Sequence, residues 1–301
     1  MTNRRFFTGW KRQEPDHRDW HYVVPRRMTA QLPAAVELSA HMPPVLDQEN
    51  LGCCGPTSAD ECIEYDERTQ GMPIDSASRL FIYWVTRSMM SGQPINQDSG
   101  VDNRTMLKAI AQYGFCRESQ WPYATASFAV KPPAECFTAA LSNRIKSYAA
   151  VQQTLDQMKG CIASGFPFLF GFDVFASFMT DSVAKTGIVP MPMTIAGDKQ
   201  VGGHDVTIFG YDDNTRMFKF RNHWVNADGT PWGDQGNGYI PYDYALSTNA
   251  SDFWVINAVP GAPVPPQPGT VVGTTGFSGS LTFENGILQN AQPNTIELTI
   301  E

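Results

Sequence analysis

The stretch Leu46-Asp-Gln-Glu-Asn-Leu-Gly-Cys-Cys-Gly-Pro-Thr-Ser58 indicates more about the fold than any other part of the chain. Pro56 fits the first turn of a helix, which we expect to run on to about Arg68. Cys54 would then lie at a helix N-terminus, where the dipole and the free N–H groups lower the pKa of a thiol. Gln48, at the Gln-to-Cys spacing of six, could offer its side-chain amide to an oxyanion beside the backbone N–H of Cys54. The stretch therefore predicts a cysteine nucleophile.

A second stretch, Val201-Gly-Gly-His-Asp-Val-Thr-Ile-Phe-Gly-Tyr211, predicts a strand that begins at a histidine. The two glycines before His204 leave space for a substrate around its ring. A polar turn at 212–216 joins this strand to residues 217–224 in a predicted hairpin. Asn222 would then lie at the end of the paired strand, where its amide oxygen can orient the imidazole. We expect His204 to take and return the proton of the nucleophile.

Helix signals precede strand signals along the chain. Helices are predicted for residues 54–68, 78–87, 105–113 and 151–164, and strands for residues 166–175, 205–211, 217–224 and 251–259. This order predicts an α+β protein with two lobes. We expect a helical lobe over residues 45–135 and a β-rich lobe over residues 136–259, with a cleft between them.

Residues 1–44 form an N-terminal arm of different composition. Residues 1–27 hold seven Arg and Lys against three acids, so they carry +4 and leave −12 for the rest of a chain of net charge −8. Aromatic residues offer anchors in the same segment: Phe6, Phe7, Trp10, Trp20 and Tyr22. We expect the arm to dock on the body and restrain activity as a pro-segment does. A solvated tail and an integral part of the domain are the alternatives.

The C-terminal residues 260–301 begin with a proline-rich linker. Asn285-Gly286 predicts the turn of a small β hairpin, and residues 295–300 could add a third strand. This tail carries no residue in a catalytic role.

Composition excludes several classes of protein. With 301 residues, 42% of them hydrophobic and 17% charged, the chain can bury a sizeable core and is not mostly disordered. The negative net charge argues against nucleic-acid and membrane partners. We find neither a signal peptide nor a transmembrane segment, so we expect a protein that is cytoplasmic or exported without a Sec signal. We also expect no disulfide among the six cysteines.

At the motifs around Cys54, His204 and Asn222, the chain resembles the papain-like cysteine peptidases. The arm resembles their bacterial and viral members in particular. The resemblance covers about residues 9–258. Its elements follow in the order of the family: Gly9-Trp10, Pro15-Asp-His-Arg-Asp19, Leu32-Pro33, Pro44-Val45, Gln48 to Cys54, Asp98-Ser-Gly100, Gly114 to Tyr123, Gly203-His204, Gly210-Tyr211, Asn222, Trp224 and Trp232 to Tyr239. The resemblance implies a two-lobe fold, with a helical lobe and a β-barrel-like lobe, between the N-terminal arm and a short C-terminal β tail.

The resemblance also implies an activity and a site. A peptide or protein substrate would be hydrolysed through a thioester on Cys54, with His204 as general base and acid, Asn222 holding its ring and Gln48 at the oxyanion. Trp224 would shield the bond between His204 and Asn222 from water. No metal or organic cofactor is implied.

Six positions depart from the pattern of the family: Asn50 for a disulfide cysteine, Cys53 for Ser or Gly, Gly55 for an aromatic, Asp205 for a small residue, His223 for Ser and Val225 for Gly. These departures keep two other functions open. One is an acyl-transfer or amide-cleaving enzyme on the same fold, and the other is a non-catalytic papain-like binding protein.

Other residues have simpler interpretations. We expect Cys53 to be structural, because the spacing from Gln48 favours Cys54 as the nucleophile. A zinc site formed by Cys53, Cys54, His204 and His223 lacks the usual ligand spacing. We expect Asp205 to be a hydrogen-bonded structural carboxylate on the strand face opposite His204. The three remaining histidines are expected to be ordinary residues of the arm or of loops: His17, His21 and His41.

Overall fold

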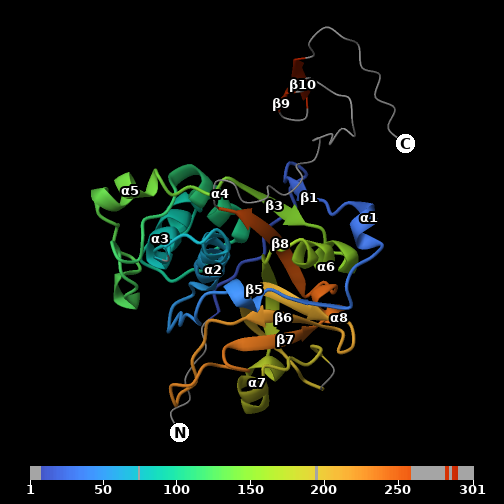
Figure 1. Ribbon diagram of the computed structural model, residues 1–301. Helices are drawn as coiled ribbons and strands as arrows, with labels where there is room; N and C mark the ends of the chain where they lie inside the picture. The colour runs from blue at the N-terminus through green and yellow to red at the C-terminus, as the bar shows by residue number, and fades with distance from the viewer. Residues whose placement is uncertain (1–7, 74, 194–195, 259–281, 285–286, 291–301) are drawn as a thin grey trace.

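The computed structural model describes residues 8–73, 75–193, 196–258, 282–284 and 287–290 (Figure 1). The arm contributes β1 (His21–Tyr22), α1 (Arg26–Thr29), β2 (Ala35–Glu37) and a 3-10 turn at Ser39–His41. The next part is helical, with α2 (Cys54–Thr69), α3 (Arg79–Met89), α4 (Asn103–Tyr113), a 3-10 turn at Thr125–Ser127 and α5 (Ala134–Ala140).

Strands dominate from residue 147 onward. The elements are β3 (Ser147–Val151), α6 (Leu155–Ala163), β4 (Phe168–Phe175), a 3-10 turn at Ala176–Met179, α7 (Asp181–Thr186), β5 (Gln200–Asp212), β6 (Met217–Arg221), β7 (Asn237–Pro241), α8 (Tyr242–Ala245) and β8 (Ala250–Asn257). Strands β9 (Thr282–Glu284) and β10 (Ile287–Asn290) pair antiparallel as a separate hairpin. The α+β class is thereby confirmed.

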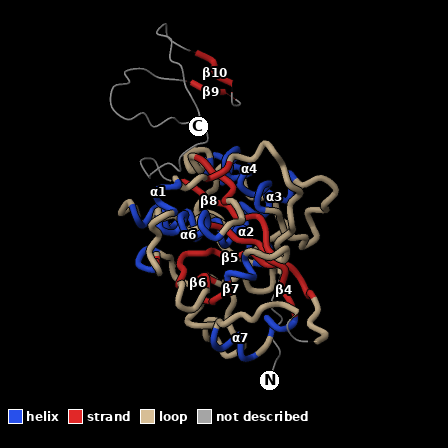
Figure 2. The backbone as a smooth tube through the Cα atoms, turned by 90° about the vertical axis from the view of Figure 1, so that its right-hand side faces the viewer, coloured by secondary structure: helices blue, strands red, loops and turns tan. Residues whose placement is uncertain are grey.

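One eight-stranded sheet organises the body. Its order is β1-β3-β8-β4-β5-β6-β7, and β2 pairs with the end of β5. Strand β1 runs parallel to β3, and the other pairs are antiparallel. The sequence predicts a barrel-like lobe, but among the described strands no pairing joins β1 to β7, so the sheet is open. Figure 2 shows the strands running through the body, with helices on either side.

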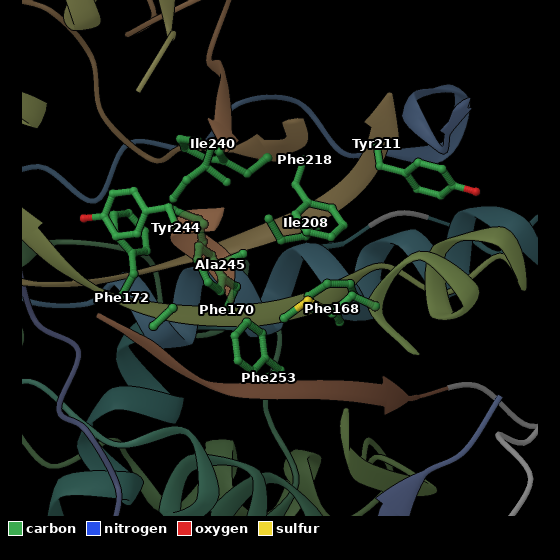
Figure 3. Packing of buried hydrophobic residues seen from close by; sticks show 14 of the residues in the cluster. Phe168, Phe170, Phe172, Ile208, Tyr211, Phe218, Ile240, Tyr244, Ala245 and Phe253 are labelled. Carbon is green, nitrogen blue, oxygen red and sulfur yellow. The ribbon is translucent and has the colours of Figure 1, made fainter. Parts of the chain in front are cut away.

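The two faces of β4 and β8 serve different cores. Alternate residues of a strand point to opposite faces, so Phe168 and Phe170 join the cluster that Figure 3 shows, whereas Leu169 packs into a second cluster with α2, α3 and α4. On β8, Phe253 joins the first cluster and Trp254 the second. The sheet is therefore the wall between two hydrophobic clusters, and the division into lobes at residue 135 stays a proposal.

Most predicted elements are confirmed. Helix α2 begins at Cys54 as predicted, and α3, α4, β4 and β8 match their predicted segments. Strands β5 and β6 pair as the predicted hairpin, although β5 begins earlier than predicted, at Gln200. The single helix predicted over 151–164 is wrong at its start, because Val151 ends β3 and α6 begins at Leu155. The helix starts there because Thr154 caps it, its side chain accepting from the N–H of Gln157. Helix α5 has no predicted counterpart.

Several predicted features fall on residues outside the described ranges. They are Phe6 and Phe7, the linker at 260–269, the turn Asn285-Gly286 and the third tail strand at 295–300. Within the described ranges, no helix is both long and apolar enough to span a membrane.

A chain that ends at Gly261 should fold as the full chain does. The last strand of the eight-stranded sheet in the chain, β8, ends at Asn257, and Ala258 packs against the helical cluster. Removing the tail should therefore change the melting temperature by less than about 2 °C. Thermal unfolding of both chains by circular dichroism tests this. A fall of several degrees would mean that the tail contributes to the core.

Candidate functional site

Cys54 is the first residue of α2, and its side chain is fully buried. The sulfur receives backbone hydrogen bonds from Gly9, Gly55 and Asp205, which lower its pKa. Burial has the larger effect and raises the pKa of the thiol to about 12. Cys53 is also buried, and its Sγ lies 3.8 Å from the carbonyl oxygen of Arg79 within the helical cluster.

His204 and Asn222 form a buried hydrogen-bonded pair. His204 Nε2 lies 2.8 Å from Asn222 Oδ1, and both side chains are fully buried. The Trp224 ring stacks on the imidazole with 4.4 Å between centroids, so it covers this bond from one side. His204 Nδ1 is buried and has no hydrogen-bond partner in the described part of the chain. That nitrogen is the one available for proton transfer.

The strand that carries His204 is longer than predicted. Strand β5 begins at Gln200 because its pairing with β4 continues that far, so His204 lies inside the strand opposite Phe172. Burial and, less strongly, the neighbouring His223 lower the pKa of His204 to about 3, although the hydrogen bond to Asn222 acts to raise it. Both Cys54 and His204 are therefore neutral at pH 7 in this structure.

Gln48 lies in the loop before α2 and is fully buried. Its Nε2 donates to the carbonyl oxygen of Leu51 at 2.9 Å. Its backbone N–H donates to His223 O at 2.9 Å, and the hydroxyl of Tyr123 donates to Gln48 O at 2.7 Å. These bonds tie the loop to the residue that follows Asn222.

The four predicted site residues are connected by short links. The N–H of Asp205, the residue after His204, reaches the sulfur of Cys54. Thr207 Oγ1 donates to Ser58 O at 3.3 Å, so β5 also runs along the first turns of α2. Asn222 is joined to His204 by a hydrogen bond, and Gln48 is joined to His223, the residue after Asn222. The four predicted site residues therefore lie around the junction of α2 and β5.

The arm crosses this junction. The N–H of Trp10 donates to Gly203 O at 3.1 Å, beside His204. The N–H of Val101 donates to Gly9 O, and the N–H of Lys11 donates to Val101 O, each at 2.9 Å. These two bonds form a parallel bridge between Trp10 and Val101. Residues 9–11 therefore lie as an extended chain between the helical part and β5.

The anchors of the arm differ partly from those predicted. Trp10 and Tyr22 are buried, but Trp20 is 45% exposed. The ion pair of Arg12 with Asp173 fits a basic arm on an acidic body. In the ion pair of Asp19 with Arg104, the arm supplies the acidic residue and the body supplies the basic one. The net charges of arm and body alone therefore do not describe how the arm docks. Strands β1 and β2 also make the later part of the arm a member of the sheet.

Asp205 is a buried, hydrogen-bonded carboxylate, as predicted. Asn103 Nδ2 donates to its Oδ2 at 2.6 Å. Burial raises its pKa to about 7. Its side chain faces α4 and α2, whereas the ring of His204 faces Trp224.

Sequence reasoning missed Glu61. Its Oε2 lies 3.2 Å from His223 Nε2, and both side chains are fully buried. The His223 ring lies 5.9 Å from that of His204, so this pair borders the proposed dyad. The signal was available, because Glu61 comes seven residues after Cys54 and therefore lies on the same helix face.

The other predicted residues lie apart from this chemistry. His17, His21 and His41 are exposed. No group of three or more His, Cys, Asp or Glu side chains in the described ranges could hold a metal ion, including the four residues considered for zinc. All six cysteines are unpaired and buried.

Known proteins resemble this chain in sequence and in fold. An uncharacterised peptidase C1-like protein of Acanthamoeba polyphaga mimivirus is 38% identical over 228 residues, which are 71% of this chain and 70% of that protein. Xylellain, a cysteine protease from Xylella fastidiosa, is 33% identical with a TM-score of 0.77, over 84% of this chain and 96% of that one. A scan against protein-family models finds no match.

More distant structures share the fold alone. The procathepsin B S9 of Trypanosoma congolense is 16% identical with a TM-score of 0.64, over 84% of this chain and 87% of that one. At that identity the likeness concerns the arrangement of the elements.

The Asp205→Asn variant should change how stability depends on pH. A raised pKa means that protonated Asp205 favours the folded state, a contribution that is lost as the pH rises from about 4 through about 7. Asparagine keeps an acceptor for Asn103 and removes the titration. Between pH 5 and pH 8 the wild type should lose on the order of 2 kcal/mol more unfolding free energy than the variant. Urea unfolding at both pH values measures this, and parallel profiles would contradict it.

Proposed function

The chain belongs to the papain-like cysteine peptidases, and from this premise we propose that it is an endopeptidase that hydrolyses peptide bonds through a thioester on Cys54. The observation that carries the proposal is the buried pair of His204 and Asn222, which occupies Nε2 and leaves Nδ1 free near the start of α2. An imidazole held in this way can act as a base and then as an acid at one nitrogen.

Acylation begins with the transfer of the Cys54 thiol proton to His204 Nδ1. The thiolate attacks the carbonyl carbon of the substrate, and the negative charge moves to the carbonyl oxygen. The backbone N–H of Cys54 and the side-chain amide of Gln48 would hold that oxyanion. His204 then gives its proton to the nitrogen of the departing amine, and the C–N bond breaks to leave the thioester.

Deacylation repeats these steps with water. His204 Nδ1 takes a proton from a water molecule, whose oxygen attacks the thioester carbon. The C–S bond breaks, the carboxylic acid product leaves, and the proton returns to the sulfur. Asn222 keeps the ring in one orientation throughout, and Trp224 keeps water from their bond.

The arm would restrain this reaction. Gly9 donates its N–H to the nucleophilic sulfur, and Trp10 occupies the edge of β5 beside His204. The arm also excludes water, which keeps Cys54 and His204 neutral. Its departure would hydrate both groups and favour the thiolate–imidazolium pair.

Substitutions should separate the roles of the four residues. Cys54→Ala should abolish cleavage of a fluorogenic peptide, and His204→Ala should lower kcat almost as far, because the two act as a unit. Asn222→Ala should cost less, about 10- to 100-fold, since it removes orientation and not the base. Labelling by a peptidyl epoxide, located by mass spectrometry, should fall on Cys54.

Cys53→Ala is the matched control and should keep most of the activity, because Cys53 lies in the helical cluster. If Cys53→Ala abolished cleavage while Cys54→Ala did not, the nucleophile would be the other cysteine.

Trp10→Ala in the full chain should raise turnover by about tenfold or more, because the arm would lose its buried anchor while β1 and β2 stay in place. Alkylation of Cys54 by iodoacetamide should accelerate in parallel. Arg18→Ala is a suitable control, because the ion pair of Arg18 is with Asp16, a neighbouring residue of the arm itself. An unchanged rate in a Trp10→Ala protein of normal melting temperature would exclude the inhibitory role.

A further inference from the structure

The loop that leads into α2 carries both proposed oxyanion donors. Gln48 would supply its side-chain amide at one end, and Cys54 its backbone N–H at the other. Between them Glu49 has a φ of 54°, in the left-handed region that residues other than glycine adopt uncommonly. Cys53 and Cys54 are both unpaired, so non-covalent contacts hold this loop. A strained backbone keeps its shape only where the surrounding structure supports it.

A buried arginine holds the start of the loop. Arg79 is the first residue of α3, and its Nη1 donates to the carbonyl oxygen of Asp47 at 3.1 Å. The same guanidinium donates to both carboxylate oxygens of Glu118, at 2.8 and 3.0 Å. A paired arrangement of this kind fixes the plane of the guanidinium. It therefore also fixes the direction of the donor that reaches Asp47.

Tyr123 joins this arginine to Gln48. The Arg79 guanidinium lies over the Tyr123 ring, 3.8 Å from its centroid, in the stacked arrangement that arginine favours on aromatic faces. At the far end of the ring, the hydroxyl of Tyr123 donates to Gln48 O at 2.7 Å. The guanidinium and the hydroxyl therefore hold the carbonyl groups of two successive residues, Asp47 and Gln48. The side chain of Gln48 starts from this fixed backbone.

A second anchor holds the end of the loop. The carboxylate of Asp98 accepts the N–H of Gly52, with distances of 2.9 and 3.2 Å from the nitrogen to its two oxygens. The hydroxyl of Tyr83 donates to the same carboxylate. Gly52 lies two residues before Cys54, so this anchor sets the direction in which the chain enters α2. Arg79 and Tyr83 both belong to α3, and one helix therefore supports both anchors.

We propose that Tyr123 and Asp98 are positioning residues, which hold the amide of Gln48 and the N–H of Cys54 at the spacing that the oxyanion requires. The inference rests on the proposed peptidase function. Both residues act through the backbone of the loop, Tyr123 at its start and Asp98 at its end. Donors that are in place before the charge develops stabilise the transition state more than the bound substrate. A loosened loop would therefore lower kcat and leave KM unchanged.

The test compares the full-length wild type with Tyr123→Phe, which keeps the ring against Arg79 and removes the bond to Gln48 O. For a fluorogenic peptide, kcat should fall about tenfold at an unchanged KM. A peptidyl aldehyde forms a hemithioacetal with Cys54, and its oxygen takes the place of the oxyanion. The inhibition constant of the aldehyde should therefore rise by about the same factor. Alkylation of Cys54 by iodoacetamide uses no oxyanion donor, so its rate should not change.

Variants at Asp98 test the second anchor. Asp98→Ala removes the acceptor of the Gly52 N–H and should give the same pattern, whereas Asp98→Asn keeps an acceptor oxygen and should restore most of kcat. If Asp98→Ala fails to fold, Tyr123→Phe still tests the proposal. Tyr242→Phe is the matched control, because Tyr242 is buried in the β-rich part and its hydroxyl donates to Asp213 at 2.9 Å. Its kcat should stay within about twofold of the wild type.

Aldehyde binding, measured by calorimetry, distinguishes failure of this inference from failure of the proposed function. Wild-type kcat and aldehyde affinity in Tyr123→Phe would overturn the positioning role alone. Equal changes in kcat, KM and the alkylation rate would also overturn it, because they would show a general disturbance of the site. An aldehyde that binds Tyr123→Phe more weakly than the wild type, with no cleavage by either protein, would support the positioning role and overturn the peptidase. Neither binding nor cleavage by the wild type would overturn both.

Discussion

Helix α2 has no face in solvent from Cys54 to Glu67, and the rest of the structure is arranged around that burial. The helix carries several carboxylates in this span, and each needs a partner. Asp60 accepts the N–H of Ala77, and Glu67 pairs with Arg117. These partners lie in the helical part of the chain.

Glu61 pairs with His223, which lies in the β-rich part of the chain. His223 follows β6, so this contact joins α2 to the loop that holds Asn222. The proposed nucleophile and the imidazole come from segments about 150 residues apart, and polar contacts along α2 hold them in register. In this fold the buried charges therefore position the site, whatever they contribute to net stability.

The local features of the site, those set by residues close together in the chain, could be predicted from the sequence. Pro56 and the Gln48-to-Cys54 spacing predict where α2 begins, and the glycines before His204 predict an accessible ring. The contacts of Trp10 with Gly203 and Asp252 could not be predicted in this way, because they join residues about 190 and 240 positions apart. Net charge predicted docking of the arm but not its path, since Asp19 and Arg104 pair against the expected sign.

Glycines explain why the proposed inhibition by the arm and the proposed catalysis would compete. Gly171, Gly202 and Gly203 line the path of the arm, and a Cβ on any of them would collide with Thr8 or Trp10. A larger residue there would release the arm, but it would equally obstruct a peptide that follows the same edge of β5. The arm is tethered to β1 and β2, so its effective concentration at the cleft is high, of the order of millimolar. A substrate in solution must therefore bind far more tightly than the arm does, or the arm must first be displaced or cut.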